Sequence, residues 1–533
     1  MFSKIIRSIA LLGMVSVGGL VIAWMLFIVG RPDPTVNYLD ELNAGIEQLS
    51  EEQKGWNIYR DVWAEYEFCE GGRRDFKELE ITDGSGTRLV RPADAEWTIA
   101  IKQLEDSTRF LDSLRAGARA PNLGLALCVN LNDYSLEDRA ALFPDLPAEG
   151  PLGGGLGVAG VAADVDHLLA ESIINLLLPH IQSFRTASRI LAVDSRYAVQ
   201  QGDTDRVVKN LVSIMGLAHQ AAESKILICK LVAVSVEQIG LELLDDLLVK
   251  NPNLFTLNQL TRVQKAIQSR EQSDDLNLSG ERLMMLDTIQ RVYTNNGQGD
   301  GRITKQGLAF LDATGLIMGE RFTGVRLVNQ FLIGPVALFS IAPRRETTRQ
   351  MESWLASMET QLKSPVYNKS TWDDLDQQMR QAAIRHPVLV SLFPDGDALH
   401  QILLKSRAQR EGVLMALAVK RYRIREGVWP ASANDLLDGF LESLPVDPLS
   451  GDSLKYHRRG ETFVIYSVGL DGEDNQGFRP RIFPGGGRPD VEIGIEEWSR
   501  ENDWVPEPTS RYQFDQPAQK GADFVIWPRK NEL

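Results

Sequence analysis

The chain has 533 residues, of which 43% are hydrophobic and 24% are charged, and its formal net charge is −15. This length allows several domains with a sizeable buried core, and the ordinary glycine and proline content excludes collagen-like and disordered classes. The acidic balance argues against a nucleic-acid partner, because proteins that bind nucleic acids carry basic surfaces.

The first predicted element is a transmembrane helix over residues 9–30, which carry no charge. At 1.5 Å per residue such a helix spans about 33 Å, enough for the hydrocarbon core. Lys4 and Arg7 precede it and acidic residues follow, which favours a signal-anchor with the N-terminus inside a bacterial cytoplasmic membrane. We therefore expect residues 1–31 to be a membrane anchor and the bulk of the chain to be periplasmic or extracytoplasmic. The alternative, a cleaved signal peptide, usually has a shorter apolar region and a small-residue cleavage site.

Residues 32–160 predict a helical region with loops that ends in a connector rich in glycine and proline. Apolar residues recur at helical spacing over 35–66 and 93–114, and the polar stretch 70–92 between them predicts a loop or short hairpin. The run Gly155–Gly160 fits the G-x-G-x-x-G pattern of dinucleotide sites. Because no strand precedes it, we interpret it as a flexible linker.

Residues 161–397 predict an α-helical array. Pro179 suits the first turn of a helix, and Asp203 or Thr204 can cap the helix that follows. The stretch that begins at Gln201 resembles the second helix of a tetratricopeptide hairpin, although no repeat of that family's period accompanies it. A second apolar stretch, residues 331–341, is too short to cross a membrane and predicts a buried or interfacial segment.

Three weaker patterns bear on metal binding or catalysis. Cys69, Cys128 and Cys229 are too scattered for a disulfide framework or a zinc site, so we expect buried thiols. The loop Asn296–Thr304, with Asp300 at its centre, resembles part of an EF-hand, but the glutamate that closes the calcium shell is missing, which favours a plain turn. The six histidines form no metal or protease motif, and His180 lies in an apolar helical run that predicts core packing.

Residues 398–533 predict a small α+β module. A helix with Leu403, Val413 and Leu417 on its inner face should end at Gly427. A turn-rich link follows, and then short strands are expected around Leu454–His457, Phe463–Tyr466 and Ala522–Trp527. A long insertion around residues 478–519 precedes the last strand.

The order of residues in this module resembles the C-terminal part of the major (G-type) pseudopilin of the type II secretion system. The positions that carry the resemblance are Tyr422, Gly427, Pro430, Leu444, Pro445, Asp447, Pro448, Gly451, Tyr456, Tyr466, Ser467, Gly469, Asp471 and Gly472. The N-terminus lacks the leader, cleavage site and acidic residue of that family, so we do not expect the chain to polymerise into a pseudopilus.

The resemblance implies a calcium site in the loop after Ser467. Carried onto this sequence, the carbonyl of Val468 and the carboxylates of Asp471 and Asp523 would bind the ion, and hard oxygen ligands suit Ca²⁺. Lys520 and Gly521 stand where the family has an acid, so a second loop carboxylate would come from Asp474, Asp490 or neither. The alternative is a structural turn without metal.

Together these patterns predict a mainly α protein with an N-terminal transmembrane helix, a helical array and a pseudopilin-like α+β module. We expect a single-pass, non-enzymatic interaction or secretion-associated protein with the membrane and other proteins as partners. Two alternatives stay open: a membrane-bound hydrolase whose site is assembled from scattered Asp, Glu and His, and a calcium-regulated adhesion or sensing protein.

Overall fold

The computed structural model describes residues 29–66, 79–83, 86–144, 171–271, 277–313, 339–460, 462–468 and 524–527, together with Phe68, Phe76, Asp474 and Gln476. Over these residues the protein is mainly α-helical with a small C-terminal sheet, as the sequence predicts. No helix in this part of the chain is both long and apolar enough to cross a membrane. Only the last two residues of the predicted transmembrane helix belong to it, and the run Gly155–Gly160 lies outside it.

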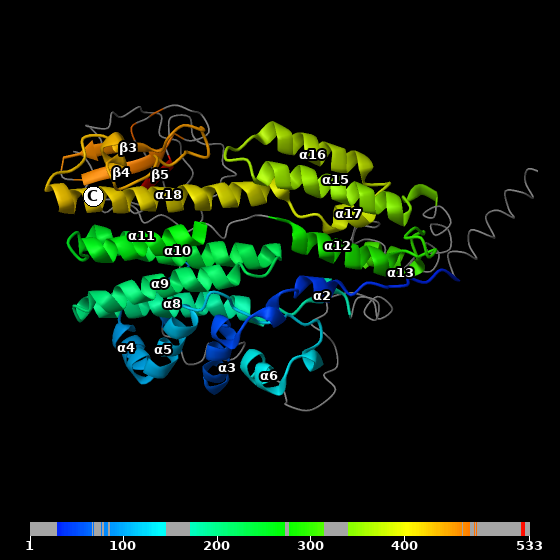
Figure 1. Ribbon diagram of the computed structural model, residues 1–533, viewed down its shortest axis with the longest axis horizontal. Coiled ribbons are helices and arrows are strands. Elements are labelled where there is room, and N and C mark those ends of the chain that lie inside the picture. Colours follow the sequence, from blue (N-terminus) through cyan, green and yellow to red (C-terminus); the bar gives the residue numbers. More distant parts are fainter. Residues whose placement is uncertain are drawn as a thin grey trace, which may run out of the picture.

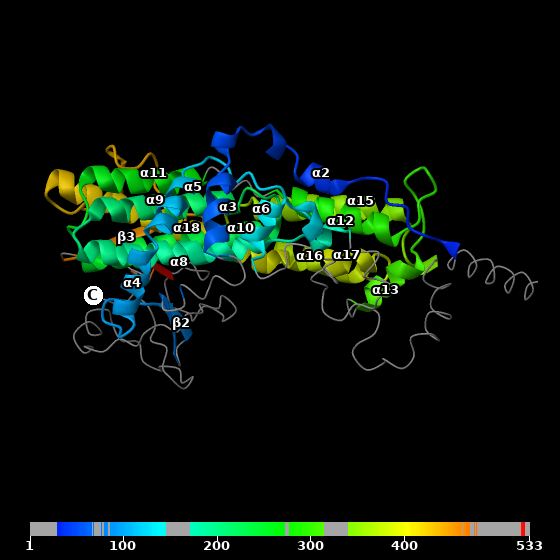
Figure 2. The ribbon, with the colours of Figure 1, turned by 90° about the horizontal axis from the view of Figure 1, so that it is seen from below.

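The centre of the molecule is an array of five helices that lie side by side (Figures 1 and 2). They are α8 (Pro179–Gln200), α9 (Thr204–Ala221), α10 (Leu227–Lys250), α11 (Leu257–Glu271) and α18 (Gly396–Glu426). As predicted, Pro179 opens α8, and the Asp203 side chain caps α9 by accepting a hydrogen bond of 3.0 Å from the Arg206 N–H. Leucine, isoleucine and valine side chains from all five helices share one core.

A smaller layer packs against α8 and α9 on the side away from α18 (Figure 1). It holds α3 (Trp56–Glu65), α4 (Trp97–Asp106), α5 (Thr108–Gly117), α6 (Leu136–Leu142) and the hairpin β1 (Glu80–Asp83) with β2 (Gly86–Leu89). The helix expected over 93–114 is split at Ser107. The helix expected over 35–66 is also split, because Gly45 adopts a left-handed conformation (φ 98°) and a capping box at Ser50 starts a new turn.

A second group of helices has its own apolar core at the other end of the molecule (Figure 1). It contains α12 (Ser279–Val292), α13 (Lys305–Ala313), α15 (Arg344–Leu362), α16 (Lys369–Ala382) and α17 (Pro387–Leu392). The short helix α2 (Tyr38–Leu42) lies against α12, and the Gln290 side chain bonds the backbone of Thr35 and Val36. At the end of the second apolar stretch, Phe339 is exposed and Ile341 is buried.

Helix α18 joins the two cores. Its first turns contribute Leu399 to the second core, and its later turns contribute Val413 and Leu417 to the array. Within the array, the guanidinium of Arg410 is almost fully buried and pairs with the buried carboxylate of Glu237 from α10 at 2.5 Å. The helix ends where predicted, because Gly427 adopts the left-handed conformation (φ 75°) that terminates helices.

A three-stranded antiparallel sheet covers the later turns of α18, as Figure 1 shows. Its order is β3 (Lys455–Arg459), β4 (Thr462–Ser467) and β5 (Phe524–Trp527), which confirms the three predicted strands. The sheet approaches α18 closely at Gly412, where an added Cβ would lie 2.1 Å from the side chain of Ile526. The rings of Phe463 and Trp527 stack on neighbouring strands.

Candidate functional site

The turn Leu444–Gly451, which leads from α18 toward the sheet, is built around the fully buried carboxylate of Asp447. Its Oδ1 accepts a hydrogen bond from the Leu449 N–H at 3.0 Å. Its Oδ2 accepts from the Ser450 hydroxyl at 2.9 Å and from the Val468 N–H at 3.3 Å. Asp447 therefore ties the turn to the end of β4. The sequence marked it as a position of the family pattern without showing this role.

The loop expected to bind calcium starts at this end of the sheet. Val468 directly follows β4 and has a buried side chain. Here the last residue of β4, Ser467, pairs with the first residue of β5, Phe524. Asp471 and Asp523, the two carboxylates of the expected site, lie outside the described residues, so this site stays a prediction.

Of the two alternative loop carboxylates, Asp490 also lies outside the described residues, whereas Asp474 belongs to them. Its Oδ1 accepts hydrogen bonds of 2.9 Å from the Tyr466 hydroxyl and the Gln476 N–H. This oxygen therefore holds a local turn against β4. Across the described ranges, no three His, Cys, Asp or Glu side chains gather in a way that would hold a metal ion.

In the EF-hand-like loop Asn296–Thr304, side-chain oxygens accept hydrogen bonds from backbone N–H groups of the loop. The side-chain oxygen of Asn296 accepts from two N–H groups within the loop, and Asp300 Oδ1 accepts from the Gly301 N–H at 2.9 Å and the Arg345 N–H at 3.1 Å. Burial raises the pKa of Asp300, but these hydrogen bonds and the Arg345 charge more than offset it, so the pKa is lowered. Asp300 thus docks the loop on the first turn of α15, which favours the interpretation as a plain turn.

Among the buried histidines of the described residues, His400 and His180 have different surroundings. In His400, Nδ1 accepts from the Trp372 indole N–H at 3.0 Å, and Nε2 lies 3.3 Å from the Ser364 carbonyl oxygen. Both ring nitrogens of His400 therefore have contacts within the protein. His180 in the first turn of α8 is 1% exposed, and no described group hydrogen-bonds to its Nδ1.

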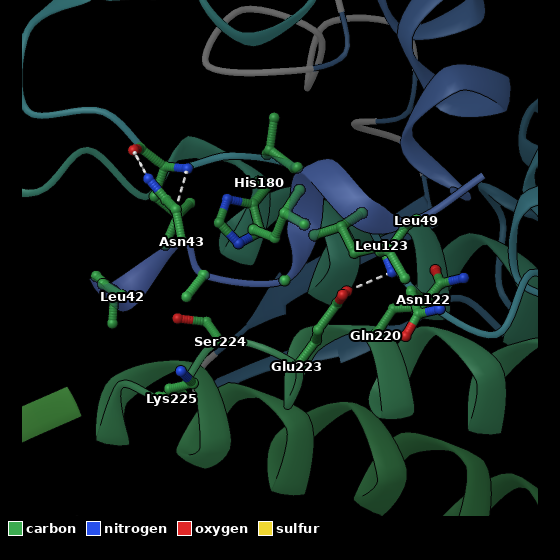
Figure 3. A pocket seen from close by; sticks show the side chains of 15 residues that line it. Leu42, Asn43, Leu49, Asn122, Leu123, His180, Gln220, Glu223, Ser224 and Lys225 are labelled. Atoms are coloured by element: carbon green, nitrogen blue, oxygen red, sulfur yellow. Dashed lines mark hydrogen bonds between the residues drawn. The ribbon is translucent and has the colours of Figure 1, made fainter. Parts of the chain in front are cut away.

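His180 faces a pocket of about 200 Å³, shown in Figure 3. Leu42 at the end of α2 and the segment after it, up to Leu49, line one side of the pocket, and residues between 122 and 127 line another. Gln220 near the end of α9 completes the wall together with Glu223, Ser224 and Lys225 from the turn after it. The pocket is thus assembled from four segments that are distant in the sequence.

Most of the pocket wall is apolar, with leucines such as Leu42, Leu49 and Leu125 around a few polar groups. Desolvation by burial lowers the pKa of His180 to about 4, so the imidazole is neutral at pH 7. Burial also raises the pKa of Glu223, although its Oε2 accepts hydrogen bonds from the backbone N–H groups of Leu123 and Gly124. No sequence pattern connects His180 with Glu223, since helical periodicity indicates burial but not which segments meet.

Neither of the two described cysteines lines this pocket. Cys229 is buried and Cys128 is half-buried, and both are free, while Cys69 lies outside the described residues. Burial raises the pKa of each described thiol to about 11, which keeps it protonated and poorly nucleophilic at pH 7. This agrees with the expectation of unpaired, largely buried cysteines.

Comparisons with protein-family models, with curated proteins and with solved structures find no match to this chain.

Proposed function

We propose that the chain is a single-pass membrane protein whose extracytoplasmic body ends in a pseudopilin-like module and acts as a non-enzymatic, secretion-associated interaction protein. The observation that carries the proposal is the unit formed by α18, the Asp447 turn and the antiparallel sheet. It has the succession of helix, turn and strands that the resemblance implies. The charge-free run over residues 9–30 supports the anchor.

The end of α18 has the composition of a protein-binding surface. Ile424 and Val428 are exposed by 49% and 57%, and Val446 beside Asp447 is exposed by 49%. Arg423 and Arg425 flank Ile424 in the sequence. Arginine is enriched at protein interfaces, and exposed loops beside small sheets commonly carry binding functions.

The membrane placement is tested on the full chain carrying a C-terminal epitope. Protease added to intact spheroplasts should remove the epitope, and the protein should sediment with membranes. Replacing residues 1–31 by a cleavable signal peptide should release it into the soluble extracytoplasmic fraction. An epitope that is degraded only after the cytoplasmic membrane is lysed would contradict the proposal.

The binding role is tested with a photo-cross-linking amino acid at Val428, in cells that make the full chain. We expect an adduct with a membrane or extracytoplasmic protein at this position. The control position is Ile99, 54% exposed on α4 in the opposite layer, where we expect none. Equal adducts at both positions, or none at either, would contradict a specific contact at the end of α18.

Calcium is part of the proposal through Val468, Asp471 and Asp523. If the ion binds, calcium at 100 times its dissociation constant should stabilise the full chain by about 2.7 kcal/mol, a chelator should reverse the effect, and Asp471→Ala should abolish it. A melting temperature that is equal with calcium and with chelator would mean that the loop is a structural turn only.

A further inference from the structure

We infer that the end of the body nearest the predicted anchor rests on the membrane surface and binds anionic phospholipid headgroups. The inference rests on the proposed function, because it takes the anchor over residues 9–30 as given and adds a second membrane contact outside it. This surface, the anchor-side end, consists of residues 29–36, 294–305, 339–349 and 384–385. Three observations lead to the inference: a short tether, exposed apolar side chains and an excess of basic residues.

A short tether holds this end near the bilayer. The charge-free run ends at Gly30, and the Gln290 side chain on α12 accepts hydrogen bonds of 3.2 Å from the N–H groups of Thr35 and Val36. It also donates a hydrogen bond of 2.8 Å to the Val36 carbonyl oxygen. Because five residues of fully extended chain span at most about 18 Å, the body is fixed close to the point where the anchor ends.

Specific contacts join the segments of the anchor-side end. The Gly301 carbonyl oxygen accepts a hydrogen bond of 3.0 Å from the Arg344 N–H, and the Arg385 carbonyl oxygen accepts one of 2.8 Å from the Ala342 N–H. Burial lowers the pKa of Arg344, and the charge of the nearby Asp33 opposes this effect. Figures 1 and 2 show that the described chain starts at this end, opposite the C-terminal sheet.

Exposed apolar side chains gather at this end. Ile384, Val29 and Phe339 are exposed by 81%, 74% and 69%, and they are three of the four most exposed large apolar side chains in the described part of the chain. The hydrogen bond between Ala342 and Arg385 joins the segments that carry Phe339 and Ile384. In water such side chains have no apolar contact, whereas the boundary between headgroups and acyl chains would provide it.

Basic residues outnumber acidic ones at this end, although the whole chain has a net charge of −15. The basic side chains, all exposed except that of Arg344, are Arg31, Arg302, Lys305, Arg344, Arg345, Arg349 and Arg385. The acidic ones are Asp33, Asp300 and Glu346. Glu346 already pairs with Arg385 at 2.9 Å. A cationic surface with exposed apolar side chains is complementary to anionic lipids, and the tether favours a bilayer over a protein as its partner.

The anchor and this surface act together. A basic patch with a few apolar side chains binds a membrane reversibly, whereas a covalent tether raises its local concentration at the bilayer. The contact therefore orients the anchored body without being strong enough to retain a released one. This agrees with the expected solubility of a chain whose residues 1–31 are replaced by a cleavable signal peptide.

The test uses the full chain in vesicles of phosphatidylglycerol and phosphatidylcholine, with a photo-cross-linking amino acid at Ile384. We expect the chain to float with the vesicles and Ile384 to form a lipid adduct, detected by mass spectrometry. Vesicles of phosphatidylcholine alone should leave flotation unchanged and reduce the adduct roughly tenfold, because they lack anionic headgroups. The control position is Val428, 57% exposed at the far end of α18, where we expect no lipid adduct.

Charge reversal locates the contact. Lys305→Glu combined with Arg349→Glu reverses two exposed cations of the anchor-side end, and it should reduce the lipid adduct at Ile384 roughly tenfold. Lys209→Glu combined with Lys265→Glu makes the same change of net charge at exposed positions of α9 and α11, and it should leave the adduct unchanged. Circular dichroism checks that both double variants keep their helix content.

Each contrary outcome has a distinct meaning. Flotation without a lipid adduct at Ile384 would overturn this inference and leave the anchor intact, whereas a chain that does not float would overturn both. An adduct of Ile384 with a second copy of the chain in place of lipid would assign the surface to self-association. Equal adducts in the two kinds of vesicle, or an equal loss in the two double variants, would refute the binding of anionic headgroups at this end.

Discussion

Two kinds of polar site in this molecule differ in whether their hydrogen bonds are made within the chain. The Asp300 loop resembles a binding loop in sequence and Asp447 is a position of the family pattern, yet in both places the carboxylate accepts hydrogen bonds from nearby backbone N–H groups. The pocket at His180 has no motif, yet it contains a buried nitrogen without a partner in the described structure. An acidic motif in the sequence can thus belong to a turn that its own carboxylate stabilises, whereas a buried nitrogen without a partner has no motif that would reveal it.

The largest effect is expected where a buried charge loses its partner. Arg410→Met leaves the Glu237 carboxylate buried and unpaired, which should reduce the free energy of unfolding by about 3–5 kcal/mol. The double variant with Glu237→Leu should recover most of this loss, because an apolar pair of similar volume replaces the ions. Chemical unfolding followed by circular dichroism measures both. A double variant as unstable as Arg410→Met would contradict this account of the pair.

The next largest effect is the pH dependence of stability that the buried His180 causes. The pKa of the residue is about 4 in the folded protein and about 6.5 in the unfolded chain. Because only the unfolded chain takes up a proton between these values, stability falls as the pH falls from 6.5 to 4, by about 3 kcal/mol in total. His180→Phe should lose about 3 kcal/mol less than wild type between pH 7 and pH 4.

Other groups titrate in the same range, so the measured quantity is the difference between the two chains. Burial lowers the pKa of His386 and His400 and raises that of Glu223 and Glu281, and all four groups are present in both chains. Unfolding curves at four or five pH values give the difference. Parallel pH profiles for wild type and His180→Phe would show that the imidazole is not held neutral by burial.

The smallest effect concerns the satisfied loops. Asp447→Ala removes three hydrogen bonds at a buried position and should destabilise the chain by about 2 kcal/mol, and Asp300→Ala at the surface by about 1 kcal/mol. Neither loss should depend on calcium, because each carboxylate stabilises backbone groups. Melting curves with calcium and with chelator check this. A calcium response that disappears in Asp300→Ala would reverse our interpretation of that loop.

The sequence predicted where helices begin and end because caps and terminating glycines act on residues that are close in the sequence. Asp203 caps α9 through a hydrogen bond to an N–H three residues away, and Gly427 ends α18 through its own backbone conformation. The missed breaks at Gly45 and Ser107 show the limit, since apolar spacing continues across a turn as readily as along a helix.

The candidate sites depend on segments that are distant in the sequence, so they were harder to predict from it. Glu237 and Arg410 are 173 positions apart, and nothing in either neighbourhood indicates the other. Periodicity placed His180 in the core correctly, but the pocket also needs residues 42–49 and Glu223, which only the packed chain brings together. The calcium prediction came from a family pattern, and its carboxylates lie outside the described residues.

The position of α18 in the chain has a consequence for biosynthesis. This helix covers apolar faces of α10 and α11, but the ribosome completes those helices well before residues 396–426 exist. At about 5–20 residues per second, the delay is on the order of ten seconds. During that interval the nascent array exposes leucines that α18 later buries, and Glu237 lacks its ion-pair partner Arg410. A chain that stopped short of residue 396 would keep that surface open to aggregation or to a chaperone.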